Sequence, residues 1–115
     1  MTDQAHTVAQ LTREFSAGLP DRLERLMTGL AALRDMPDPR AIERFYLEAH
    51  SLKGTAKAYG ADQVARCAAD LSVLAGAWYD GGSTPMAEVD VAAGCLERLR
   101  EAIEQWRQHT DAEQS

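Results

Sequence analysis

The sequence has only two cysteines, no long run of apolar residues and an excess of acidic over basic side chains. A chain of 115 residues buries most of its apolar surface without metals or disulfides. Cys67 and Cys95 both fall on apolar faces of expected helices, so we interpret them as reduced core residues of a cytoplasmic protein. No apolar run approaches membrane-spanning length, and the N-terminus lacks a signal-peptide pattern. The net charge of -6 argues against a nucleic-acid partner.

The sequence also lacks the common patterns of a self-contained enzyme. It has no Glu-x-x-His repeat for a di-iron bundle and no Cys/His pair with zinc spacing, so we expect neither metal nor cofactor. Gly81-Gly82 is interpreted as a linker, because no strand precedes it and no P-loop lysine follows. Ser51 and Thr55 have no carboxylate placed to build a nucleophilic triad. Since no nucleotide-binding domain fits in this length, autonomous kinase activity is not expected either.

Helix formers dominate, and no stretch sustains the period-two alternation of a strand. We predict an all-α fold, an antiparallel up-down four-helix bundle with a short N-terminal helical extension. The single domain spans residues 1–115, with a bundle core at about 7–109. The extension is a first helix from about Thr7 to Phe15, and the following Gly18-Leu19-Pro20 either breaks this helix or merely bends it. A core-facing stripe then follows helical spacing: Leu19, Leu23, Leu26, Leu30 and Leu33.

Turn residues place the other boundaries. Asp38 is a plausible N-cap and Pro39 a first-turn residue for the second helix, which Gly60 ends. A third helix begins near Asp62 and stops at residues 80–83, and Thr84 is expected to cap the last helix. The inner faces of these two helices are Val64, Cys67, Ala68, Leu71, Leu74 and Trp78, and Val89, Ala92, Leu96, Leu99, Ile103 and Trp106.

His50 lies in the middle of the helix predicted from about Pro39 to Tyr59. At about 100° per residue, one set of side chains forms a buried face roughly 120° away from the histidine. That set is Ile42, Phe45, Ala49, Leu52, Ala56 and Tyr59. A second set gathers around His50 and faces solvent: Glu43, Tyr46, Lys53, Gly54 and Lys57.

Gly54 is costly at this place, because a glycine inside a helix costs roughly 1 kcal/mol relative to alanine. Its benefit is space, since no side chain then stands between His50 and an approaching partner. A lone surface histidine is more often simply solvated, but the cluster with Lys53 and Gly54 favours a functional role. An exposed imidazole with cations beside it and steric clearance suits a phosphoryl acceptor.

The stretch His50-Ser51-Leu52-Lys53-Gly54 resembles the signature of histidine-containing phosphotransfer (HPt) domains of bacterial phosphorelays. The similarity covers roughly residues 8 to 80, including the turn at Tyr59-Gly60-Ala61. It implies that His50 accepts a phosphoryl group from, and donates it to, an aspartate of response-regulator receiver domains, which supply the magnesium and the acidic pocket. A hybrid sensor histidine kinase is a further candidate partner. Lys53 and Gly54 would assist transfer, and partner contacts are assigned to Glu43, Tyr46, Leu47 and Lys57.

A second class of function remains open, a non-phosphorylated bundle that docks on receivers or kinases as an inhibitor or scaffold. The joint presence of His50, Lys53 and Gly54 weighs against it. The sequence departs from the family pattern at Lys57, which adds charge, and at Ser72, where the family often has an acid or amide. We expect a monomer, and a free-standing domain rather than a segment of a hybrid kinase.

Overall fold

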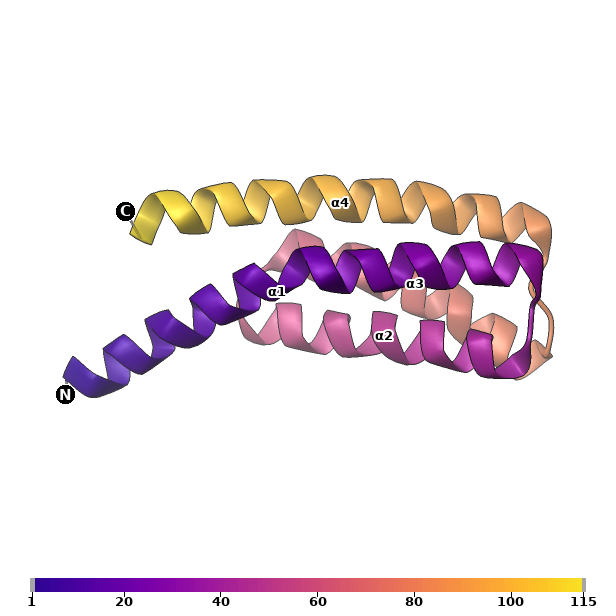
Figure 1. Cartoon of the computed structure of the whole chain (residues 1–115), viewed down its shortest axis with the longest axis horizontal. Helices are drawn as coiled ribbons and strands as arrows, with labels where there is room; N and C mark the ends of the chain where they lie inside the picture. Colours follow the sequence, from indigo (N-terminus) through magenta and orange to yellow (C-terminus); the bar gives the residue numbers. More distant parts are fainter. Residues whose placement is uncertain (1, 115) are drawn as a thin grey trace.

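A computed structural model describes the backbone of residues 2–114 and the side chains of residues 7–112. It contains four helices, α1 (Thr2–Asp35), α2 (Pro39–Ala58), α3 (Asp62–Gly81) and α4 (Met86–Gln114), and no strand within the described backbone. Each helix packs against its two neighbours in an antiparallel ring, α1 closing it against α4 (Figure 1). The described chain measures 51 × 22 × 18 Å. The predicted up-down four-helix bundle is confirmed.

Helix α1 continues through Pro20 without a break. Proline lacks the N–H that would bond the carbonyl of Ser16, so one helical hydrogen bond is lost and a bend is the expected result. Figure 1 shows the N-terminal part of α1 running at an angle to the remainder and away from α4. Of the two outcomes that the sequence left open, the bend is therefore the one observed, and the N-terminal extension is the first part of α1.

The bend leaves the start of α1 poorly covered. Phe15 is buried, stacked on Tyr59 with ring centroids 4.6 Å apart and edge-on to Trp106 at 5.2 Å. Val8 and Leu11 precede Phe15 at helical spacing, so the sequence pattern puts them on the same face of α1 as Phe15, yet they are 62% and 45% exposed. They lie in the diverging part of the helix, where the other helices no longer cover them.

Both ends of α2 form as predicted, and they fix the position of His50. The Asp38 carboxylate accepts a hydrogen bond from the Arg40 amide at 2.9 Å, and Pro39 is the first helical residue. Gly60 has a φ of 76° after the C-cap Tyr59. The Ala61 amide then reaches back to the Ala56 carbonyl at 2.8 Å, which closes the helix in a Schellman motif.

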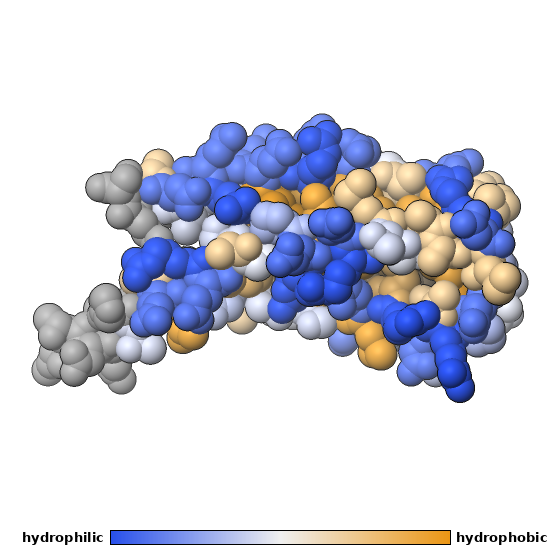
Figure 2. All heavy atoms as spheres, viewed as in Figure 1, coloured by the Kyte–Doolittle hydropathy of each residue, from blue (hydrophilic) through white to orange (hydrophobic). Residues whose placement is uncertain are grey.

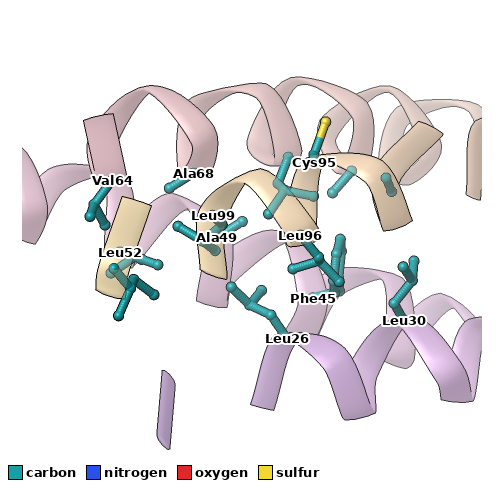
Figure 3. Packing of buried hydrophobic residues seen from close by; sticks show 14 of the residues in the cluster. Leu26, Leu30, Phe45, Ala49, Leu52, Val64, Ala68, Cys95, Leu96 and Leu99 are labelled. Carbon is teal, nitrogen blue, oxygen red and sulfur yellow. The ribbon is translucent and has the colours of Figure 1, made fainter. Parts of the chain in front are cut away.

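The core lies between all four helices, and Figure 3 shows side chains converging from each of them. The predicted inner faces are confirmed, with the more peripheral members only partly buried. Those peripheral members are Leu23, Tyr59, Cys67, Leu74 and Trp106. The α2–α3 pair is the most extensive helix pair, and Gly76 of α3 lies against the Tyr46 ring of α2. The outer surface in Figure 2 is mainly hydrophilic, with apolar areas toward the end that carries the α1–α2 and α3–α4 connections.

The start of α4 differs from the prediction. The helix begins at Met86, and the amides of Glu88 and Val89 both bond the Pro85 carbonyl at 3.0 Å. Pro85 therefore occupies the cap position rather than the first turn. The Thr84 hydroxyl oxygen is buried without a hydrogen-bond partner among the described residues, so the predicted Thr84 cap is wrong.

Candidate functional site

His50 lies exposed in the middle of α2, between the buried neighbours Ala49 and Leu52. The well-defined caps and the continuous apolar face of α2 leave this helix one way to pack. That packing turns the imidazole outward, as the sequence pattern predicts. Within residues 7–112, the structure records no hydrogen bond or ion pair to the imidazole.

Two lysines and a glycine accompany the histidine along α2. Lys53 is half-buried one turn away, so its stem packs while its ammonium group reaches solvent, and Lys57 is exposed one turn further. Neither ammonium group pairs with a carboxylate in the part of the chain that the structure describes. Gly54 is exposed, and a Cβ built there would meet nothing within 4 Å. The site therefore offers free positive charge and open space beside the imidazole.

Tyr46 lies one turn before His50, and its ring stacks on the imidazole with centroids 5.7 Å apart and planes 26° apart. Two further contacts come from α3. Tyr79 stacks on Tyr46 at 6.2 Å, and a Cβ built on Gly76 would lie 3.3 Å from the Tyr46 ring. Tyr46 is therefore half-buried between two helices, not a free surface side chain.

The remaining predicted contacts, Glu43 and Leu47, are both exposed. Leu47, 52% exposed, lines a groove of about 730 Å³ between α1 and α2. Phe45 and Gly29 also line this groove, where a Cβ on Gly29 would lie 3.3 Å from the Phe45 ring. The exposed face of α2 thus has two borders, aromatic toward α3 and a groove toward α1.

Apart from Ser72, noted as a departure from the family pattern, residues of α3 were missing from the sequence-based site. Because α2 and α3 are antiparallel and Tyr46 packs on Gly76, the turn with His50 faces the preceding turn of α3, which carries Ser72 and Val73. Ser72 is buried, whereas Val73 is 74% exposed. Val73 and Tyr79 are large apolar residues off the core-facing period of α3, which is the signal that could have identified them.

Other candidate chemistry finds no support among the described residues. No three His, Cys, Asp or Glu side chains of the described part are grouped so that they could hold a metal ion. No described helix has the length and apolar character needed to cross a membrane. Cys95 is buried and Cys67 half-buried, both as free thiols. Burial raises the pKa of the Cys67 thiol, Arg98 opposes this rise, and Asp70 adds to it.

Comparison with known families decides the identity of the chain. The family model described as Hpt domain matches residues 10–109, nearly the whole chain. The chain belongs to the Hpt domain family. Hpt domains are phosphocarriers of phosphorelays, and they interact with response-regulator receiver domains. No curated protein and no solved structure matches this Hpt domain significantly.

Proposed function

We propose that this Hpt domain carries a phosphoryl group on His50, exchanging it with an aspartate of receiver domains in a bacterial two-component phosphorelay. The observation that supports the assignment is the exposed imidazole beside Gly54, where a built Cβ meets nothing within 4 Å. Membership of the Hpt family supports the type of reaction. We further propose that it acts as a cytoplasmic monomer and as one domain across residues 1–115.

The reaction requires a nitrogen lone pair and a path to the phosphorus atom. An imidazole nitrogen of His50 attacks the phosphorus of the aspartyl phosphate, forming a P–N bond. The P–O bond to the aspartate breaks, and the carboxylate leaves with the electron pair while the other ring nitrogen keeps its proton. Transfer in the opposite direction reverses these bond changes. Lys53 is placed to stabilise the charge on the transferring phosphoryl oxygens, because its ammonium group is one turn away and unpaired among the described residues.

Recognition is proposed to use the two borders of the exposed α2 face. Lys57 offers a positive charge in line with His50, which complements the acidic active site of a receiver. Tyr46 and Leu47 offer apolar surface on opposite sides of the imidazole, and Glu43 adds a charge on the far turn. These contacts need no ordering of a mobile loop, because all four side chains stand on one helix.

The test is phosphoryl transfer from a labelled receiver to wild type and His50→Gln. We expect transfer to wild type and none to the variant, and the product should be labile in acid and stable in base, as a phosphoramidate is. His109→Gln is the matched control, since it removes another exposed histidine on a different helix and should leave transfer intact. Label persisting on His50→Gln, or lost in His109→Gln, would contradict the assignment.

A non-phosphorylated docking module is the alternative. Such a module would bind receivers without accepting label, and His50→Gln would bind as tightly as wild type. Measuring binding and transfer on the same proteins therefore separates the two functions. Lys53, which pairs with no carboxylate within residues 7–112, and the clearance at Gly54 favour the carrier, because docking alone requires neither.

A further inference from the structure

Three aromatic rings form a continuous stack that ends on the imidazole of His50. Tyr79 on α3 stacks on Tyr46 with planes 17° apart, and Tyr46 stacks on the imidazole with planes 26° apart. The centroid distances of 6.2 Å and 5.7 Å lie within the usual range for aromatic pairs. The stack thus extends from α3 to α2, so the surroundings of the histidine depend on how these two helices pack.

Tyr46 is fixed more firmly than a surface tyrosine. It packs against the buried core and is only half-exposed. The place where its ring lies is available because residue 76 is glycine, since a Cβ there would lie 3.3 Å from one ring carbon and 3.7 Å from another. A contact of 3.3 Å is tight for a Cβ, so an alanine at position 76 should displace the Tyr46 ring.

No hydrogen bond, ion pair or second aromatic contact holds the imidazole in the described part of the chain. The Thr55 hydroxyl, one turn beyond, donates to the Ser51 carbonyl at 2.9 Å. Glu48 is engaged by Arg25 at 2.7 Å. Neither ring nitrogen has a hydrogen bond within residues 7–112, so stacking on Tyr46 is the contact in this part of the chain that can orient the ring.

We propose that Tyr46 is a positioning residue for phosphoryl transfer, which holds the plane of the His50 imidazole and is itself held by Tyr79 and Gly76. This inference rests on the proposed function. The attacking lone pair lies in the ring plane, so the plane must align with the P–O bond that breaks as the P–N bond forms. An offset stack acts on a face of the ring, whereas the nitrogens lie on its edge, so an exposed His50 can keep this contact while its edge meets the receiver. Tyr46 itself does not touch the phosphoryl group.

The first test observes the ring without any phosphate. Proton–carbon and proton–nitrogen NMR spectra of the His50 imidazole are compared for wild type, Tyr46→Leu and Tyr46→Phe. We expect the ring-current shifts of His50 to be lost in Tyr46→Leu and kept in Tyr46→Phe, because only the phenyl ring preserves the stack. Unchanged His50 signals in Tyr46→Leu would overturn the proposal.

The second test measures transfer from a phosphorylated receiver at varied concentration. Losing an aromatic pair should lower the population of the correctly oriented imidazole by about two- to tenfold. Tyr46→Leu should therefore lower the transfer rate at saturation by about two- to tenfold. Any change in the half-saturating receiver concentration should be smaller than the change in the saturated rate, because leucine keeps an apolar side chain at this recognition contact. Tyr46→Phe should restore the saturated rate of wild type. If Tyr46→Leu raised the half-saturating receiver concentration but left the saturated rate unchanged, the proposal would be overturned, because Tyr46 would then be a docking contact only.

Gly76→Ala gives an independent variant, because it acts on Tyr46 without altering either stacked ring beside it. Because the Tyr46 ring must give by only a few tenths of an ångström, the variant should shift the His50 signals and slow the saturated rate in the same direction as Tyr46→Leu, but by less. Melting curves show whether it is folded, and if it unfolds, the comparison of Tyr46→Leu with Tyr46→Phe decides. A failure of the proposed function can be told apart from a failure of the role proposed for Tyr46. If wild type accepts no phosphoryl group from any receiver, the kinetic test is void, but the NMR comparison still decides whether Tyr46 orients the ring.

Discussion

Replacing Gly54 should raise stability and lower function at the same time. Gly54 lies in the interior of α2, it is exposed, and its φ is not in the left-handed region. A Cβ there would meet nothing within 4 Å, so the folded domain has no steric reason to resist a side chain. The glycine therefore costs helix propensity without contributing any packing that the structure shows.

The stability gain can be estimated from the helix alone. Gly54→Ala should stabilise the domain by about 1 kcal/mol, and Gly54→Gln by about 0.5 kcal/mol. With about 2.1 cal/mol/K of unfolding entropy per residue, a chain of 115 residues has about 0.24 kcal/mol/K. The corresponding rises in Tm are about 4 °C and about 2 °C.

The functional loss follows from the position of Gly54 beside His50. A glutamine side chain one turn from the imidazole would occupy the space through which a receiver brings its aspartyl phosphate. Reacting atoms must approach within about 3–3.5 Å, and a displacement of about 1 Å costs about a hundredfold in rate. We therefore expect Gly54→Gln to transfer about a hundredfold more slowly from a receiver, although it melts slightly higher than wild type.

Two comparisons isolate the steric cause. Gly18→Gln is the matched control, since Gly18 is also inside a helix with nothing within 4 Å of a built Cβ, and it should gain stability without losing transfer. Phosphoramidate, a small donor that needs no docking, should phosphorylate His50 in Gly54→Gln nearly as fast as in wild type. The reasoning is refuted if receiver transfer is undiminished in Gly54→Gln, or if the variant unfolds.

Four further outcomes are expected. Lys53→Ala should slow transfer by about tenfold at unchanged stability, because its ammonium group no longer offsets charge on the phosphoryl oxygens; an equal rate would remove it from the mechanism. Lys57→Ala should lower the association rate and flatten its salt dependence in stopped-flow measurements, while identical slopes would place it outside the interface. Asp38→Ala should cost about 1 kcal/mol, seen as a Tm lower by about 4 °C, because the Arg40 amide loses its cap. Burial raises the pKa of the Cys67 thiol and Asp70 adds to the rise, so Asp70→Asn should speed alkylation of Cys67 by iodoacetamide at a fixed, mildly alkaline pH. Because the thiol binds its proton more tightly in the folded domain, its contribution to folding stability should fall as the pH rises through the thiol range.

Much of the site follows from the sequence because it is local to one helix. Asp38, Pro39 and Gly60 set the ends of α2, and its apolar residues recur with the helical period, so the outward direction of His50 follows without reference to other helices. The same local geometry places Gly54 beside the imidazole. Patterning alone also gave the four-helix bundle, since short turns between amphipathic helices leave few other ways to bury their apolar faces.

The tertiary structure decided what depends on contacts between distant segments. The sequence assigned Tyr46 to partner contact, but only the packing of α2 on α3 shows its ring between Gly76, Tyr79 and the imidazole. Likewise, Pro20 could break or bend α1, and the structure shows one continuous helix, with Phe15 before the proline packed on Tyr59 and Trp106. A sequence pattern specifies which face of a helix is buried, but the neighbouring helix determines which side chain meets which, and that pairing sets the surroundings of His50.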